Sequence, residues 1–234
     1  MEKKILITGA CGFIGLNLSK FLLKKKFKNL LLLDNFSTSD NKTLQQFKKY
    51  KINFFNIDLR NKFKLKKIFS EWKIDTIIHL AGYTDAIQSN RFKKRYKENN
   101  IDTTKNLLAL SKDFNVKKII FASTAAVYGD QKNNQPIKEN SNLKPVNYYG
   151  KTKLICEDLI KKNFQLKNQK NYIILRFFNV VGRNFSDYKK NFSKNLFNIL
   201  YEKFQTNKKF FIFGKNLKTK DGTPVRDFVY VDDL

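Results

Sequence analysis

The sequence predicts an α/β protein in which helices cover both faces of a doubly wound parallel β-sheet. Short apolar runs of strand length alternate along the chain with stretches whose apolar residues recur at helical spacing. Several of the strand-like runs are apolar throughout rather than alternating, which is typical of strands buried on both faces. Regular alternation of strands and helices favours a parallel sheet with right-handed crossover connections.

The expected elements follow one another in chain order. Strands are predicted at residues 4–8, 30–34, 52–57, 76–80, 118–123 and 172–177. Helical spacing of apolar residues lies between them, at residues 13–22, 65–72 and 107–110.

The pattern changes in two later stretches. Residues 129–147 are rich in Asn, Gln and Lys and are expected to form a surface loop. Beyond residue 177, the spacing predicts one long helix over residues 192–200, then an edge at 212–214 and a final strand at 228–231.

Length and composition exclude several classes of protein. The chain has 234 residues, 41% of them hydrophobic, which suits one large domain or one and a fraction and excludes a disordered or collagen-like chain. No apolar run approaches the ~20 residues of a membrane-spanning helix, and the N-terminus is interpreted as a strand rather than a signal peptide. Cys11 and Cys156 lie far apart without a CxxC pattern, so we expect a reduced, cytoplasmic protein and no metal site.

The net charge of +27 needs interpretation before it is taken as function. Only six of the 47 basic residues are arginine, the side chain best shaped for phosphate and guanine contacts. The lysines are spread in twos and threes over expected helix surfaces. The sequence therefore favours a solvated lysine-rich surface and makes nucleic-acid binding unlikely, although a polyanion-binding face stays an alternative. Either surface would attract phosphorylated ligands.

A glycine-rich turn directly follows the first predicted strand. Gly9, Gly12 and Gly15 permit a tight turn, close approach of the backbone to a pyrophosphate and close packing of the next helix. That helix would present free N–H groups and the positive end of its dipole to the anion. A strand, a glycine turn and a helix in this order predict a Rossmann-like dinucleotide site. Cys11, inside the turn, is interpreted as a small filler residue.

An acidic residue indicates which dinucleotide binds. Asp34 ends the second predicted strand, nineteen residues after Gly15. A carboxylate at this place accepts a hydrogen bond from the adenosine ribose 2′-OH and would repel a 2′-phosphate. The sequence therefore predicts NAD rather than NADP.

A tyrosine and a lysine four residues apart are the candidate catalytic pair. Tyr149 and Lys153 would share one face of a helix. A phenol titrates near pH ~10, so it serves as a base at neutral pH only if an ammonium group and a positively charged nicotinamide stabilise its anion. Thr124 ends a predicted strand, at the edge where open α/β sheets bind ligands. Tyr148 has no lysine four residues on and is not favoured.

These motifs together resemble those of the extended short-chain dehydrogenases/reductases, and most of all the UDP-glucose 4-epimerase family of NAD-dependent epimerases/dehydratases. The resemblance runs nearly from end to end and rests on residues 8–15, 34–37, 58–59, 79–82, 99–100, 123–129, 149–153 and 176–182. The most discriminating stretch is residues 218–228, Lys-Thr-Lys-Asp-Gly-Thr-Pro-Val-Arg-Asp-Phe, because neighbouring families carry a shorter connection there.

The resemblance implies a role for each matching residue. The glycines would hold the pyrophosphate, Asp34 and Asn35 the adenosine, and Asp58 and Leu59 the adenine. The whole implied NAD site is Gly9, Gly12, Phe13, Ile14, Gly15, Asp34, Asn35, Asp58, Leu59, Leu80, Ala81, Asn99, Tyr149, Lys153 and Phe178. The implied substrate contacts are Thr124, Tyr149, Asn179, Asn195 and Arg226.

Within that site the resemblance implies that Tyr149 is the acid/base, Lys153 its electrostatic partner and a ribose ligand, and Thr124 the contact to a substrate hydroxyl. His79 matches a position of the family scaffold and is interpreted as structural.

Two features depart from the family pattern. Position 84 is Thr where the family usually has a lysine, which affects one NAD contact. The chain also stops at residue 234, where family members continue. The resemblance therefore implies an NAD-binding Rossmann domain at residues 1–180, and at 181–234 only the beginning of a smaller, incomplete sugar-nucleotide domain.

The residues that follow Thr124 indicate which reaction of the family is catalysed. Dehydratases of the family carry an acidic pair there, whereas this chain has Ala125 and Ala126, which accept no proton. The resemblance therefore implies an isomerase, which interconverts UDP-glucose and UDP-galactose through a transient 4-keto intermediate. Three alternatives stay open: another nucleotide-sugar epimerase or reductase, a truncated or inactive NAD-binding module, and an idle basic module that binds RNA. The family also implies a homodimer formed by helices around residues 90–112 and 150–164.

Overall fold

The computed structural model describes residues 2–130, 136–165, 170–182, 196–212, 216–217 and 219–234. It divides into two compact units, Met1–Phe177 and Phe178–Leu234.

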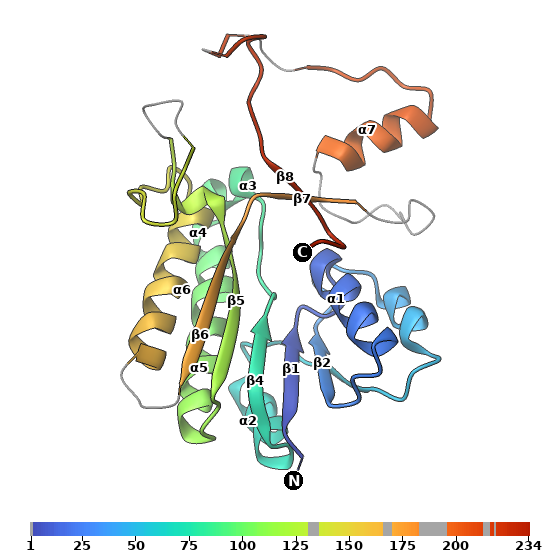
Figure 1. Ribbon diagram of the computed structural model, residues 1–234, viewed down its shortest axis with the longest axis vertical. Coiled ribbons are helices and arrows are strands. Elements are labelled where there is room, and N and C mark those ends of the chain that lie inside the picture. The colour runs from blue at the N-terminus through green and yellow to red at the C-terminus, as the bar shows by residue number, and fades with distance from the viewer. Residues whose placement is uncertain (1, 131–135, 166–169, 183–195, 213–215, 218) are drawn as a thin grey trace. The chain divides into compact units, whose positions relative to one another are not determined.

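The first unit is built on a six-stranded parallel sheet (Figure 1). Its strands in chain order are β1 (Lys4–Thr8), β2 (Leu30–Asp34), β3 (Asn53–Asn56), β4 (Ile74–His79), β5 (Lys118–Thr124) and β6 (Asn171–Phe177). Their order across the sheet is β3-β2-β1-β4-β5-β6. The chain builds outward from β1 in one direction and then, from β4, in the other. The carboxyl ends of β1 and β4 therefore flank the switch point, where open α/β sheets bind ligands.

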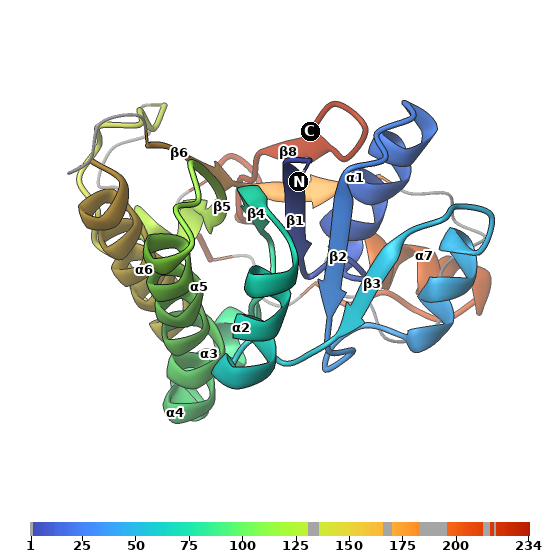
Figure 2. The same ribbon diagram turned by 90° about the horizontal axis from the view of Figure 1, so that it is seen from below.

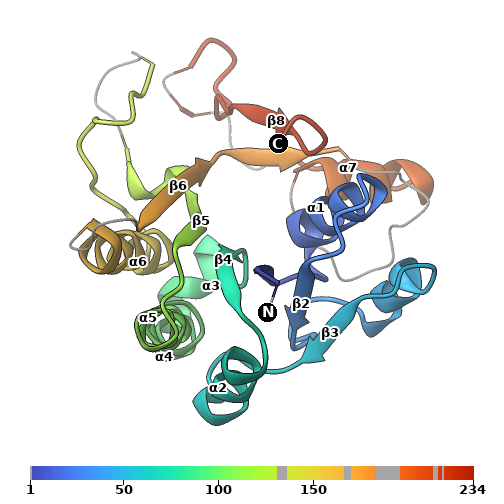
Figure 3. The ribbon, with the colours of Figure 1, turned by 60° about the horizontal axis from the view of Figure 1, so that its bottom comes forward.

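Helices cover the two faces of this sheet unequally. The helices α2 (Lys62–Glu71), α5 (Thr103–Asp113) and α6 (Tyr148–Gln165) lie on one face, and α1 (Phe13–Lys24) lies on the other with the 3-10 helix η1 (Asn41–Phe47) (Figures 2 and 3). Successive strand residues point to opposite faces.

Leu6 therefore joins the core beneath α2, α5 and α6, and Ile7 joins the core beneath α1. β2 is buried along its whole length, as a strand covered on both faces must be.

Short helical segments fill the connection between β4 and α5. They are α3 (Ala86–Arg91), α4 (Lys93–Tyr96) and the π-helical turn η2 (Lys97–Asp102). Asp85 caps α3, because its side chain accepts a hydrogen bond from the backbone N–H of Gln88. A further 3-10 turn, η3 (Ala125–Val127), follows β5 directly. Short π-helical turns are rare and frequently lie at functional sites.

The second unit contains two short strands and one helix among its described residues. β7 (Asn179–Val181) pairs in parallel with β8 (Phe228–Tyr230), and α7 (Leu196–Gln205) lies between them in sequence. The stretch before β8 forms a turn, in which the carboxylate of Asp221 accepts hydrogen bonds from the backbone N–H and the hydroxyl of Thr223. In the part of the chain that the structure describes, every helix is too short or too polar to cross a bilayer.

The predicted α/β fold with a doubly wound parallel sheet is confirmed. The first two strands have the predicted bounds, and the other four differ by one or two residues at an end. The predicted loop at 129–147 has neither helix nor strand in its described residues.

Beyond residue 177 the observed elements differ more from the predicted ones. The helix expected over 192–200 is observed as α7, which begins at Leu196 and continues to Gln205, while Phe192 lies outside the described residues. The predicted edge at 212–214 is not observed at Ile212, and Phe213 and Gly214 lie outside the described residues.

The two-faced core predicts a large difference between two isoleucines. Ile77 is fully buried in β4, whereas Ile87 on α3 is 86% exposed. Ile77→Ala should lower the free energy of unfolding by roughly 2–5 kcal/mol, because it removes buried methyl groups and leaves a cavity. Ile87→Ala should change it by less than about 0.5 kcal/mol. Urea denaturation measures both, and equal losses would contradict the placement of β4.

Candidate active site

The glycine turn between β1 and α1 brings three segments of backbone into contact. Gly9 has a φ of +71°, a conformation that favours glycine, and a Cβ added there would lie 2.7 Å from the backbone nitrogen of Ala81. A Cβ added at Gly15 would overlap the carbonyl oxygen of Gly9. Glycine at these positions therefore lets the loop, the start of α1 and the end of β4 pack directly against one another.

The first turn of α1 offers unoccupied backbone N–H groups. Its N-cap is Gly12, no side chain of the described residues caps it, and its first turn, which begins with Phe13 and Ile14, contains no acidic residue. The first N–H groups of a helix have no partner within the helix, and the helix dipole is positive at this end. The turn is thus shaped and polarised to bind an anion such as a pyrophosphate.

Asp34 anchors this turn to the end of β2. One carboxylate oxygen accepts from the backbone N–H of Cys11 at 2.9 Å, and the other accepts from the N–H of Phe36 at 2.8 Å and the hydroxyl of Ser39 at 3.0 Å. A carboxylate can accept about four hydrogen bonds, and three are made here. One acceptor position therefore stays open on the Asp34 oxygen that binds Cys11. Burial raises the pKa of the Cys11 thiol, with a further contribution from the charge of Asp34, so Cys11 stays a neutral filler in the turn.

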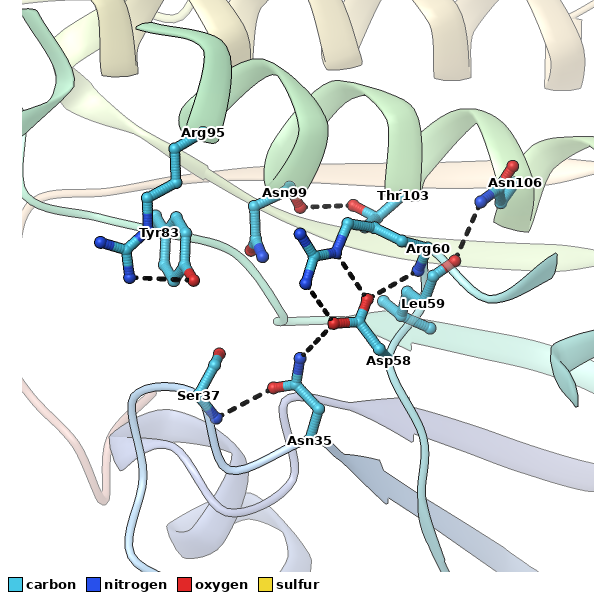
Figure 4. A network of polar contacts seen from close by, with 10 residues as sticks. All are labelled: Asn35, Ser37, Asp58, Leu59, Arg60, Tyr83, Arg95, Asn99, Thr103 and Asn106. Carbon is cyan, nitrogen blue, oxygen red and sulfur yellow. Dashed lines mark hydrogen bonds and ion pairs between the residues drawn. The ribbon is translucent and has the colours of Figure 1, made fainter. Parts of the chain in front are cut away.

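The carboxylate of Asp58 is fully engaged (Figure 4). One oxygen accepts from the backbone N–H and Nε of Arg60, and the other accepts from an Arg60 Nη2 at 2.7 Å and from the Asn35 amide at 2.9 Å. The hydrogen bonds from Arg60 lower the pKa of Asp58 to about 2. An adenine amino group reaching Asp58 would therefore have to replace one of these donors.

The residues opposite Asp58 come from the segment between β4 and α5. The amide of Asn99 points into the space between Tyr83 and Arg60 (Figure 4). Arg95 lies over the Tyr83 ring, with its guanidinium carbon 4.6 Å from the ring centroid, and donates a hydrogen bond to the Tyr83 hydroxyl at 3.2 Å. Leu59 is held in place through its carbonyl, which accepts from the Asn106 amide at 2.9 Å.

Tyr149 lies in the first turn of α6, and side chains from α3 and the preceding loop fix where that helix begins. The backbone N–H of Tyr149 donates to the Ser89 hydroxyl at 2.9 Å, and that of Gly150 donates to the Asn147 side chain at 2.8 Å. These bonds satisfy N–H groups that have no partner within the helix. The position of Tyr149 is thus set before its side chain makes any contact.

Lys153 lies one helical turn further and is only 3% exposed. Its ammonium donates to the carbonyl oxygen of Ala122 at 2.9 Å and lies 4.8 Å from the centroid of the Phe121 ring. A Cβ added at Gly82 would lie 3.4 Å from the Lys153 Nζ, so the backbone after β4 passes directly beside this cation.

Burial moves the titrations of the pair in opposite directions. It raises the pKa of Tyr149 to about 12, although a hydrogen bond with Thr124 acts to lower it. It lowers the pKa of Lys153 to about 8, although Cys156 and Glu157 act to raise it. In the chain alone the phenol therefore keeps its proton at neutral pH, and its anion requires a further positive charge in the site.

His79, at the end of β4, is enclosed between two hydroxyl groups. Its Nδ1 lies 2.8 Å from the Thr8 Oγ1 and its Nε2 lies 3.0 Å from the Thr104 Oγ1. Burial lowers the pKa of His79 to about 3, so the ring is neutral and links β1 to α5. Among the described residues no group of three or more His, Cys, Asp or Glu side chains could hold a metal ion.

The first unit therefore brings most of the predicted site residues to one edge of the sheet. The remaining four are in the second half of the chain. Phe178, Asn179 and Arg226 belong to the second unit, and Asn195 lies outside the described residues. The Asn179 amide donates to the carbonyl of Asp227 at 3.0 Å, across the β7–β8 pair.

Sequence reasoning missed several residues of this region. Arg60, Asn100, Glu157 and Arg176 were not singled out, yet each makes several hydrogen bonds beside the predicted residues. Two signals were available: Asn100 and Arg176 lie in stretches that match the family, and Glu157 lies four residues after Lys153.

A doubly wound sheet with a glycine turn and a Tyr-Lys pair at its carboxyl edge defines a dinucleotide-binding protein of the short-chain dehydrogenase/reductase type. The chain belongs to the NAD dependent epimerase/dehydratase family, whose model matches residues 5–234.

Individual relatives agree with this assignment. The chain is 35% identical over 245 residues to UDP-glucose 4-epimerase 2 of Arabidopsis thaliana, covering 100% of this chain and 69% of that protein. UDP-glucose 4-epimerase of Bifidobacterium longum, solved in complex with NAD+ and UDP, superposes with a TM-score of 0.87 at 30% identity, covering 99% of this chain and 71% of that one. UDP-N-acetylglucosamine 4-epimerase of Methanobrevibacter ruminantium M1, solved with UDP-N-acetylmuramic acid, gives 0.82 at 30% identity, covering 99% and 70%.

The residues of the first unit fit NAD, the cofactor of the family. The cradle formed at Gly9 and Gly15 would be filled by any Cβ, and the uncapped start of α1 faces it. Asp34 retains one free acceptor position at the end of β2, where a ribose hydroxyl would be bound. Lys153 provides a buried cation beside the backbone of Gly82.

Filling the space at the glycine turn should weaken cofactor binding. In Gly15→Ala the new methyl group would overlap the Gly9 carbonyl and force the turn open, so the affinity for NAD should fall at least about tenfold. Leu18→Ala, in the same helix, loses packing but leaves the turn intact and serves as the control. Isothermal titration with NAD measures both variants, and unchanged binding by Gly15→Ala would contradict the assignment of this turn.

The Asp58–Arg60 pair should make stability depend on pH. Because the folded pKa of Asp58 is about 2, below the ordinary value near ~3.9, its contribution is present at neutral pH and is lost as the pH falls through about 2. Asp58→Asn should therefore be less stable than the parent by about 1 kcal/mol at pH ~7, since solvent screens this partly exposed pair.

Denaturation at a series of pH values should show this difference shrink between about pH 4 and pH 2. Added salt should reduce it at neutral pH. A difference that stays constant over the whole range would mean that the carboxylate is not held by Arg60.

Proposed function

We propose that this chain interconverts UDP-glucose and UDP-galactose by epimerisation at C4 of the hexose, through a transient 4-keto sugar. The observation that carries the proposal is the placement of Tyr149 and Lys153 on one face of α6, with Thr124 at the adjoining end of β5. Support also comes from relatives named UDP-glucose 4-epimerases, at 35% identity for those of Arabidopsis thaliana and Lactobacillus helveticus.

The proposed proton transfer uses the phenol of Tyr149. As the phenolate it accepts the proton of the sugar 4-OH, and it returns that proton when the ketone is reduced again. NAD, which the glycine turn and Asp34 would hold, would supply the redox chemistry, by reversible hydride transfer with C4. The Lys153 ammonium stabilises the phenolate, and the Thr124 hydroxyl holds the reacting oxygen.

Epimerisation fits the residues after β5 better than dehydration does. Dehydration needs a second acid/base group to remove the neighbouring proton and expel a hydroxyl. The turn η3 carries Ala125 and Ala126 at the positions next to Thr124, and neither methyl group accepts a proton.

The proposal also assigns a binding role to each part of the chain. Residues 1–180 bind NAD, with Phe178 among the proposed contacts. Residues 181–234 contribute Asn195 and Arg226 to the nucleotide diphosphate of the substrate, together with Asn179 just before them. Amide and guanidinium groups are suitable donors to phosphate oxygens.

A second candidate is another nucleotide-sugar epimerase or reductase with the same chemistry. Its support is the similarity to UDP-N-acetylglucosamine 4-epimerase of Methanobrevibacter ruminantium M1. Parallel assays with UDP-glucose and UDP-N-acetylglucosamine discriminate between the two. A protein that retains NAD but turns over neither substrate would be an NAD-binding module instead.

The proposal also covers the oligomeric state and the cellular location of the protein. We infer a homodimer that forms through the helices around residues 90–112 and 150–164, supported by the apolar side chain of Ile155, which is 42% exposed on α6. A cytoplasmic location is supported by the two cysteines, Cys11 and Cys156, which are both buried free thiols.

The decisive experiment replaces one of two adjacent tyrosines. Tyr149→Phe should lower kcat for UDP-galactose by about 10²–10⁴-fold, because it removes the group that transfers the proton, while the protein keeps its NAD. Tyr148→Phe, the neighbouring residue without a lysine four positions on, should retain near-parental turnover. Substantial turnover by Tyr149→Phe would remove this tyrosine from the mechanism.

A further inference from the structure

A fully buried carboxylate lies one helical turn beyond Lys153. Glu157 has no exposed side-chain surface and occupies the same face of α6 as Tyr149 and Lys153. One of its oxygens accepts hydrogen bonds from the Ser123 hydroxyl on β5 and from the Arg176 Nε on β6. The other accepts from the Arg176 Nη2 at 2.7 Å. A single side chain of α6 therefore binds both neighbouring strands.

Arg176 is itself held on several sides. Its Nη1 donates to the hydroxyl of Tyr128 at 3.0 Å and to the carbonyl of Glu139 at 2.8 Å. Its guanidinium carbon lies 5.0 Å from the centroid of the Tyr128 ring. The planar fork of the arginine is thus fixed between α6, the turn after β5 and the loop that precedes α6, and it presents the fork to Glu157 in one orientation.

The strand residues held by this pair are those that flank the catalytic contacts. Ser123 is the register partner of Arg176 in the β5–β6 ladder. Directly before it, the Ala122 carbonyl accepts from the Lys153 ammonium, and directly after it is Thr124, which hydrogen-bonds Tyr149. The Ser123–Glu157 hydrogen bond therefore fixes the position of the end of β5 along α6.

We infer that Glu157, through Ser123 and Arg176, is a positioning residue that fixes the end of β5 against the Tyr149–Lys153 face of α6 and places an anionic charge one turn from the Lys153 ammonium. This inference rests on the proposed function, because it concerns the geometry and charge of the same site. Neither Glu157 nor Arg176 touches the reacting atoms, so both act through other residues.

The charge of Glu157 matters because few other groups stabilise the protonated form of the buried Lys153 amine. Besides Glu157, the groups near its ammonium are Cys156 on α6, the neutral ring of His79 from β4, and the Ala122 carbonyl and Phe121 ring from β5. Burial lowers the pKa of Lys153, and Glu157 is one of two groups that act to raise it. The opposite charge on Arg176 moderates that effect, so the two members of the pair should act on Lys153 with opposite signs.

Stability is a weak explanation for such a pair. Taking two charges out of water costs about as much free energy as their attraction returns, so buried ion pairs contribute little net stability. A role in orientation and charge accounts for a buried Glu–Arg pair that contacts three elements around the site.

The test measures the titration of the Lys153 amine in the full 234-residue protein, by NMR of the lysine ε-carbons, with Lys153→Met to assign the signal. Glu157→Gln keeps the shape of the side chain but removes its charge, so the midpoint should fall by about one pH unit. Arg176→Met leaves the carboxylate with only the partly exposed Lys161, whose ammonium lies 3.9 Å from the Glu157 Oε2, so the midpoint should rise. The double variant Glu157→Gln/Arg176→Met should return it close to the parental value.

The matched control is Glu71→Gln, which removes a carboxylate of α2 from the exposed pair with Lys67 and should leave the midpoint unchanged. Opposed shifts in the two single variants support the inference, and either shift alone suffices if the other protein does not fold. No shift, or shifts of the same sign, would overturn it. The alkaline limb of the pH profile for epimerisation should move with the NMR midpoint. If the variants show these shifts but the parental protein has no turnover, only the proposed function is refuted.

Discussion

The burial of one ammonium group, that of Lys153, constrains much of the first unit. A cation without water must find acceptors and counter-charges in the protein, or lose its proton. The Ala122 carbonyl and the Phe121 ring provide the local partners, and both belong to the end of β5. That strand end must therefore lie at a fixed depth against α6. The hydrogen bonds at the start of α6 and those of Glu157 hold the strand end at this depth. Both sets of bonds therefore determine the position of Tyr149, the candidate acid/base.

The fold was predictable because its signals are local. β1 and β2 were found with their exact bounds, since strands buried on both faces are apolar runs bounded by turn residues. The spacing of Tyr149 and Lys153 likewise specifies one helix face without knowledge of the rest. The π-helical turn η2 escaped prediction, because an extra residue in a helix leaves no periodic signal.

The candidate site was predictable as a set of residue types but not as a set of contacts. Asp58 matched its motif, yet both of its oxygens are taken by Arg60 and Asn35. Glu157 meets Ser123, which is far away in sequence, through the register of a strand pair. Such pairings depend on how strands and helices align in three dimensions. Periodicity and composition report burial and secondary structure, and they contain no information on that alignment.

The turn η2 carries two adjacent asparagines with different tasks. Each added residue rotates the following part of a helix by about 100° about its axis. Asn99 points towards Arg60, while Asn100 is buried, where its amide binds both backbone groups of Tyr83 and the Thr152 hydroxyl. Deletion of a single residue before Asn100 would turn its side chain outward and put Ile101 in the inward position, which would break the hydrogen bonds that join the loop after β4 to α6. This stretch should therefore tolerate point changes on its surface far better than any insertion or deletion.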